Sequence, residues 1–276
     1  MSEIKLLALD LDDTLLREDL TISFHTKNVL KKVEESGVIV MLASGRSPAA
    51  MDRYARDLGM HKRPGYLVCN NGTTILESHT GTVVKEFFLP IEAALAVYDL
   101  VDAEGFPVQI YDEGTIYVSR RNEYADIDQK LTGQRQVVVD NFRSFLAAGA
   151  QKMVIPGDPS LLRPLETLLK TFISDRVTIF TSKPYFLEIL PPATGKGEAL
   201  AVVAQMLGID RSQVMAIGDS MNDESMIRWA GFGVAMANGD PRIKAIAKAV
   251  TNRTNEEDGV ADFVEQYLLK RRTHAG

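Results

Sequence analysis

Two carboxylates near the start of the chain, Asp10 and Asp12, stand at the end of the apolar run 4–9. Such a run is typical of a strand that is buried on both faces, as in a parallel sheet. Because alternate residues of a strand point to the same side, the two carboxylates can converge on one small site. Two like charges at such a short distance require a cation, a shared proton or an outward turn of one side chain. The pair therefore indicates a site for a cation or a proton, with a solvated acidic turn as the alternative.

Other segments favour a site, because polar residues follow further apolar runs. Ligands of open α/β sheets bind outside the carboxyl ends of the strands, so we expect these residues to meet at one edge. Oxygen ligands without a Cys or His cluster suit magnesium rather than zinc. The ammonium, hydroxyl and backbone N–H groups suit a phosphate. The residues concerned are Ser44 and Gly45 after the run 38–43, Asp219, Asn222 and Asp223 after the run 214–217, and Lys196 before the helix-like stretch 198–207.

With these residues the chain resembles phosphatases of the haloacid dehalogenase (HAD) superfamily, in their Cof-type branch (subclass IIB). Four motifs of the superfamily occur in order: Asp10-Leu-Asp-Asp-Thr14, Ser44 in Ala-Ser-Gly-Arg, Lys196 in Gly-Lys-Gly-Glu-Ala-Leu, and Gly218-Asp-Ser-Met-Asn-Asp223. The segments 69–72, 233–238 and 255–261 also resemble that branch, so the similarity extends from residue 6 to about residue 261. One departure is Asp13, where the first motif commonly has Gly. We expect its side chain to point outward.

The resemblance implies a reaction through an aspartyl-phosphate. Asp10 would be the nucleophile, because a carboxylate is ionised at pH 7 and divides one hard step into two. Asp12 would be the general acid for the leaving alcohol and then the base for water. A crowded acidic site is expected to raise the pKa of Asp12. Mg²⁺ would be bound by the side chains of Asp10 and Asp219 and by the backbone carbonyl of Asp12.

The resemblance also assigns the phosphate-binding groups. Ser44 and the N–H of Gly45 would hold phosphate oxygens, and Lys196 would offset the charge of the nucleophile and the phosphate. Backbone N–H groups of Leu11 and Asp12 would add a small anion-binding nest. Two residues of the last motif have less defined roles. Asn222 would bind the phosphate or a water, with a turn residue as the alternative, and Asp223 would orient Lys196 or a water rather than contact the metal.

Strand-like and helix-like segments alternate over the first 75 residues and again from residue 194, which predicts an α/β fold with a Rossmann-like parallel sheet. Between them the pattern is mixed, with a hairpin at 108–119 and strands near 151–155, 176–181 and 185–190. We therefore expect a core from 1–89 and 191–276 with an inserted α+β domain at 90–190, the position of the cap in the Cof-type branch. Pro90 and Pro191-Pro192 are candidate hinges.

The composition restricts the function classes. The 276 residues carry a net charge of −6, and the one short basic run is Lys270-Arg-Arg272, so we expect no nucleic acid as the main partner. The single cysteine, Cys69, excludes an intrachain disulfide and favours a reducing compartment. No apolar stretch approaches 18 residues, and three Asp residues interrupt the first apolar run. We expect neither membrane span nor signal peptide, a cytoplasmic location, and a monomer or weak dimer.

The function expected from these features is a Mg²⁺-dependent phosphatase for small phosphate monoesters, such as sugar phosphates or related metabolites. A phosphomutase of the same superfamily is one alternative, and a non-catalytic protein that binds phosphorylated metabolites is another. Release of free phosphate, as opposed to formation of an isomer, separates the first two. The substrate would be chosen by the inserted domain, whose polar or aromatic candidates are Tyr111, Tyr117, Arg120, Arg121 and Lys183.

Overall fold

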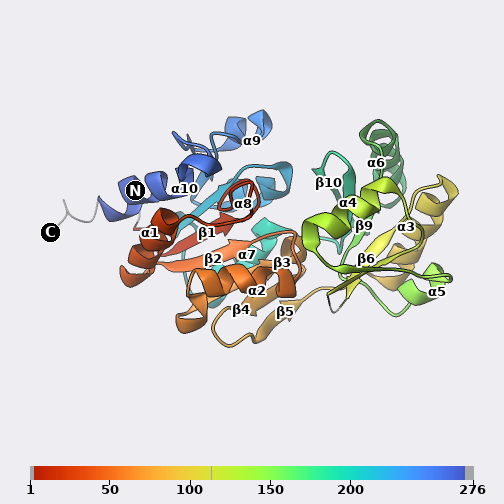
Figure 1. Cartoon of the computed structure of the whole chain (residues 1–276), viewed down its shortest axis with the longest axis horizontal. Helices are drawn as coiled ribbons and strands as arrows, with labels where there is room; N and C mark the ends of the chain where they lie inside the picture. Colours follow the sequence, from red (N-terminus) through yellow and green to blue (C-terminus); the bar gives the residue numbers. More distant parts are fainter. Residues whose placement is uncertain (1–2, 113, 271–276) are drawn as a thin grey trace.

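Two β-sheets, each with its own helices, form the framework of the computed structural model (Figure 1), which describes residues 3–112 and 114–270. The first sheet has eight described strands. Six neighbouring strands are parallel, and two more are added at one edge by antiparallel pairing. Their order across the sheet is β14 (Ala249–Val250), β13 (Phe232–Ala235), β12 (Val214–Gly218), β1 (Leu6–Asp10), β2 (Ile39–Ala43), β3 (Gly65–Cys69), β4 (Thr74–Glu77) and β5 (Val83–Glu86).

Helices cover both faces of this sheet, which explains why its central strands are almost wholly apolar. Alternate residues of β1 enter two different cores: Leu7 and Leu9 pack on one side, and Leu6 and Ala8 on the other. The helices of the first side are α1 (Phe24–Glu35), α2 (Pro48–Asp57) and α10 (Gly259–Val264), and those of the second are α7 (Lys196–Met206), α8 (Glu224–Trp229) and α9 (Pro241–Ile246).

The second sheet takes all six strands from residues 109–190 and is mainly antiparallel, with one parallel pair between β7 and β8. Its order is β10 (Thr178–Lys183), β11 (Phe186–Leu190), β9 (Met153–Pro156), β6 (Gln109–Asp112), β7 (Thr115–Val118) and β8 (Arg135–Val138). A third hydrophobic core joins one face to α3 (Ile91–Ala103), α5 (Phe142–Leu146) and α6 (Pro159–Ile173). The helix α4 (Glu123–Thr132) lies toward the first sheet (Figure 1) and lines a cavity shared with it.

Short turns of helix complete the described chain. They are the 3₁₀ segments Met60–Lys62, Asn70–Gly72, Arg211–Gln213, Met221–Asp223 and Asn255–Glu257, and the π-helical segment Glu265–Leu269. No helix in the described part of the chain is long and apolar enough to cross a membrane.

The predicted α/β class, with a mainly parallel sheet and a second α+β unit, is confirmed. The elements α4, β8 and α5 were not predicted, because the sequence between 120 and 150 shows no strong periodicity. Glu113 in the predicted hairpin turn, and Arg271 and Arg272 of the basic run, lie outside the described residues. The boundaries at 89/90 and 190/191 stay a prediction.

Candidate active site

A buried lysine joins two carboxylates at the carboxyl edge of the first sheet. Asp10 is the last residue of β1, and Lys196 is the first residue of α7. The Lys196 Nζ lies 2.6 Å from Asp10 Oδ1 and 2.6 Å from Asp223 Oδ1, and the lysine has no exposed surface. Burial lowers the pKa of Lys196, but the charges of Asp10 and Asp223 outweigh burial and raise it. The lysine therefore stays charged and holds the candidate nucleophile in place.

Asp219 follows β12 and completes an acidic triad with Asp10 and Asp223. One carboxylate oxygen of each lies within 4.8 Å of the others. Thr14 Oγ1 donates to Asp219 Oδ1 over 2.9 Å, and Asp223 Oδ2 accepts the backbone N–H of Asp219 over 2.9 Å. Gly218 permits this packing, because a Cβ there would lie 2.6 Å from the Asp223 carboxyl group. The strand end and the following turn thus present their carboxylates to one point.

The acidic triad has the chemistry of a divalent metal site. Burial and the charge of Asp223 raise the pKa of Asp219 to about 7. Burial and the charge of Asp223 also raise the pKa of Asp10, while Lys196 opposes the rise. A bound cation would offset this repulsion, and the donors are the hard oxygens that magnesium prefers. Asp223 contacts Lys196 as expected, and in addition it belongs to the triad, which was not expected.

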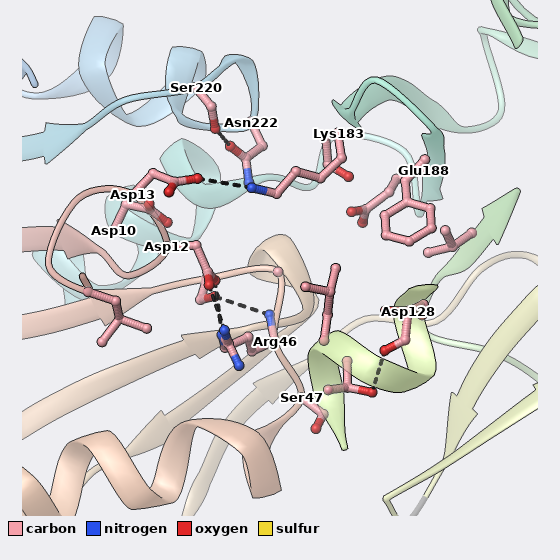
Figure 2. Close-up of a pocket in the computed structure, with 18 of the residues that line it drawn as sticks. Asp10, Asp12, Asp13, Arg46, Ser47, Asp128, Lys183, Glu188, Ser220 and Asn222 are labelled. Carbon is pink, nitrogen blue, oxygen red and sulfur yellow. Dashed lines mark hydrogen bonds and ion pairs between the residues drawn. The ribbon is translucent and has the colours of Figure 1, made fainter. Parts of the chain in front are cut away.

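Asp12 lines the same cavity as Asp10, but its partner is an arginine instead of Lys196. Its two carboxylate oxygens accept hydrogen bonds from Arg46, at 2.9 Å from Nε and 2.6 Å from Nη2 (Figure 2). Burial raises the pKa of Asp12, but the hydrogen bonds and charge of Arg46 outweigh burial, and the net pKa is lowered. The expected rise in the pKa of Asp12 is therefore wrong, because no pattern in the sequence indicates that Arg46 pairs with Asp12.

Ser44 and Gly45 follow β2 and line the cavity beside Asp10 and Asp12. The Ser44 hydroxyl accepts the backbone N–H of Arg46 over 3.2 Å. Ser44 does not cap the helix that follows, since the N-cap of α2 is Ser47. Gly45 packs closely against Asn71, because a Cβ there would lie 3.0 Å from the Asn71 side chain.

The remaining predicted phosphate-binding residues are placed differently from one another. Asn222 lines the cavity, where its Nδ2 donates to Asn71 Oδ1 over 3.2 Å and its Oδ1 accepts from Ser220 over 2.5 Å. The side chain of Leu11 is buried in the core, so only its backbone is available to a ligand. Its carbonyl oxygen accepts the N–H groups of Leu15 and Leu16, which fixes the turn after β1.

Opposite these strand ends lies the cap wall, which we define as Tyr111, Asp128, Lys152, Lys183 and Glu188. With the strand ends it encloses a cavity of about 350 Å³, within the range for a small-molecule site (Figure 2). Lys152 Nζ donates to the carbonyl oxygen of Gly45 over 2.9 Å, and Glu188 accepts from Asn71 over 2.7 Å. The two units therefore meet directly at the site.

Four residues of the site were not predicted from the sequence: three of the cap wall, and Asn71. Asp128, Lys152 and Glu188 stand alone in segments without a motif, whereas Asn71 lies in the segment 69–72 that resembles the Cof-type branch. Of the five cap candidates, Tyr111 and Lys183 line the cavity and Tyr117 does not. The last two, Arg120 and Arg121, line a separate cavity of the second unit.

Asp13 is exposed, but it lines the cavity instead of pointing away from it as expected, and its backbone has a φ of 60°. That left-handed conformation is the one in which Gly is normally favoured. The Asp13 carboxylate lies 3.0 Å from Lys183 Nζ, so the departure from the motif connects the strand end to the cap wall (Figure 2).

The fold and the arrangement of the site agree with the comparison to known sequences, in which the family described as haloacid dehalogenase-like hydrolase matches residues 7–264. The chain belongs to this family. A haloacid dehalogenase-like hydrolase from Bacteroides thetaiotaomicron is a similar solved structure, with 32% identity, a TM-score of 0.85, and coverage of 96% of this chain and 99% of its own.

Two relatives carry names that state an activity. The 5-amino-6-(5-phospho-D-ribitylamino)uracil phosphatase YcsE of Bacillus subtilis is 30% identical, over 97% of each protein. The HMP-PP phosphatase of Serratia proteamaculans is 28% identical, over 96% of this chain and 95% of its own. The chain is thus an enzyme of a phosphatase family, and activity on small phosphate substrates is supported.

Proposed function

We propose that the protein is a Mg²⁺-dependent phosphatase that hydrolyses small phosphate monoesters, such as sugar phosphates or related metabolites, through an aspartyl-phosphate on Asp10. The observation that carries the proposal is the pair of 2.6 Å contacts from buried Lys196 to Asp10 and Asp223, inside an acidic triad. A lysine so placed favours the ionised form of the carboxylate and holds it in position, which is what a nucleophile for phosphorus requires.

In the first step a carboxylate oxygen of Asp10 attacks phosphorus, and the bond from phosphorus to the leaving oxygen breaks. Asp12 gives a proton to the leaving alcohol and later takes one from the water that attacks the aspartyl-phosphate. Because Arg46 now holds Asp12 as a carboxylate, the entering substrate must loosen that ion pair before Asp12 can act as an acid. Arg46 would then be free to contact the phosphate.

The phosphate oxygens would lie among Ser44, the N–H of Gly45, Asn222 and Lys196. The first three line the cavity, and Lys196 contacts Asp10, which also lines it. Mg²⁺ held by Asp10 and Asp219, with the carbonyl oxygen of Asp12, would offset the charge of the phosphate when bound. The Lys196 ammonium and the backbone N–H groups at the ends of β1 and β2 supply the remaining positive charge.

The class of substrate rests on the size of the cavity and on the names of the relatives. A volume of about 350 Å³ suits one small metabolite rather than a polymer. One relative is named for a phosphorylated ribitylamino-uracil, which is a small phosphate metabolite.

The test is release of inorganic phosphate from a panel of phosphorylated metabolites, with the full chain, before and after chelation and with Mg²⁺ restored. We expect turnover of several small monoesters that disappears on chelation and returns with Mg²⁺, because uncompensated carboxylates repel a phosphate dianion. Full activity in metal-free protein would contradict the metal requirement. Isomer formation without free phosphate would favour a phosphomutase instead.

A further inference from the structure

The charges that line the cavity are unequal in number. Six carboxylates and four cations line it, and the cap wall holds two of each. The carboxylates are Asp10, Asp12, Asp13, Glu18, Asp128 and Glu188, and the cations are Arg17, Arg46, Lys152 and Lys183.

Each of the four cations already has a carboxylate partner. The distances are 3.0 Å for Arg17 and Asp258, 2.6 Å for Arg46 and Asp12, 3.5 Å for Lys152 and Glu188, and 3.0 Å for Lys183 and Asp13. Lys152 also donates to Gly45 O, so its position is fixed twice. Arg46 and Asp12 line the cavity together with Asp10, where they would serve the phosphate. No uncommitted cation of the cap wall therefore remains for a second anionic group of a substrate.

Asp128 is the carboxylate of the cap wall without such a partner. Only 6% of it is exposed, and its Oδ2 accepts from Tyr111 and from Gln109, both neutral donors. Burial raises the pKa of Tyr111 well above its ordinary value, so the phenol keeps its proton and remains a donor. Within the described ranges, no cation lies at ion-pair distance from Asp128 and no group donates to its Oδ1. That oxygen is left for a ligand.

We infer that the cavity selects phosphate monoesters whose leaving group is neutral or positively charged and rich in hydrogen-bond donors, and that it rejects those with a second anionic group. An amine or hydroxyl of the leaving group would donate to Asp128. A second phosphate or a carboxylate would face Asp128 and Glu188, while Asp13 neutralises Lys183, the cation that could have received it. Selection of this kind depends on repulsion of the wrong substrate as much as on attraction of the right one.

This inference rests on the proposed function, and the first test uses the unmodified protein with Mg²⁺ at pH 7. Three esters that share a six-carbon frame are compared: glucosamine 6-phosphate, glucose 6-phosphate and 6-phosphogluconate. We expect kcat/KM for the carboxylate-bearing ester to be at least about tenfold below that for glucose 6-phosphate, with the amine-bearing ester equal to or above glucose 6-phosphate. Equal or higher kcat/KM for 6-phosphogluconate would overturn the inference.

Two variants test which residues cause the selection between charged leaving groups. Asp128→Asn keeps the shape and removes the charge, so the ratio of kcat/KM for the amine ester to that for the carboxylate ester should fall at least about fivefold. Asp13→Asn, which tolerates the same left-handed backbone, releases Lys183 and should lower the ratio in the same direction. Glu123→Gln is the matched control, because it removes a charge from the exposed side of the same helix, α4, and should leave the ratio within about twofold. An unchanged ratio in both variants would overturn the assignment to these residues.

A binding measurement separates this inference from the proposed function. Calorimetric titration of Asp10→Asn with the same three esters reports charge selection without turnover. The same order of affinities together with no phosphate release from the unmodified protein would sink the phosphatase proposal and leave the selection standing. Equal affinities for the three esters, together with normal phosphate release from the unmodified protein, would overturn the charge selection and leave the phosphatase proposal standing.

Discussion

The carboxyl edge of the first sheet and the cap wall opposite it hold their charges in different ways. At the sheet edge, Lys196 is fully buried between Asp10 and Asp223, with both contacts at 2.6 Å. Where the cap wall meets the sheet edge, the side chains of Lys183 and Asp13 are about half exposed, at 42% and 50%, and they form one ion pair with each other. A buried charge with two partners cannot move cheaply, whereas an exposed pair can open and close. Lys196 therefore fixes a reacting group, whereas the pair of Lys183 and Asp13 can adjust to the leaving group.

The largest effect should follow loss of the nucleophile. Asp10→Asn removes the attacking oxygen, so we expect kcat to fall by about 10³-fold or more, in line with removal of other nucleophiles. Circular dichroism and size-exclusion behaviour should be unchanged, because Asn fills the same space beside Lys196. Phosphate release that persists in this variant, after deamidation is excluded by mass spectrometry, would contradict the aspartyl-phosphate.

The next largest effect concerns the buried lysine. Lys196→Met leaves Asp10 and Asp223 without their common cation, so the free energy of unfolding should fall by about 3 to 5 kcal/mol. Activity should be lost as well. Lys183→Met removes the exposed partner of Asp13 and should cost about 1 kcal/mol or less. Urea unfolding of both variants measures the difference, and similar losses would refute the contrast between the two regions.

Much of the sheet edge could be predicted from the sequence because topology places it. Parallel strands end at the same edge, so polar residues after the apolar runs at 4–9, 38–43 and 214–217 had to lie near one another. The contact of Lys196 with Asp223 was also expected. The pairing of Arg46 with Asp12 was not, because the direction of a long side chain depends on packing that no spacing rule describes.

The cap wall could not be predicted in the same way. Asn71 and Glu188 are 117 residues apart and meet only when the two units are folded against each other. Asp128 lies on α4, a helix that was missed although its ends carry ordinary signals: Asn122 caps its start, and Gly133 ends it with a φ of 68°. Those signals could have located the helix, but nothing in the sequence shows which of its faces meets the cavity.

A smaller effect should distinguish the two regions in substrate ranking. Ser44→Ala removes a hydroxyl beside the phosphate, so kcat/KM should fall by a similar factor, about 10- to 100-fold, for every ester. Lys183→Ala should change the order of the esters by several-fold, about the value of one substrate contact. A phosphate-release panel run on both variants gives the comparison. If Lys183→Ala and other cap-wall variants left every relative rate unchanged, the cap wall would not choose the substrate.

The smallest effect concerns the backbone where the two regions touch. Asp13 has a φ of 60°, which costs a residue with a Cβ up to about 1 kcal/mol relative to Gly. Asp13→Gly relieves that cost but loses the ion pair with Lys183, so the free energy of unfolding should change by less than about 1 kcal/mol. Asp13→Ala keeps the cost and also loses the pair, so it should be less stable than Asp13→Gly by about 1 kcal/mol. Urea midpoints of the two variants decide the point: if the alanine variant is as stable as the glycine variant, the left-handed backbone at Asp13 carries no strain, and an aspartate is tolerated there without help from the ion pair.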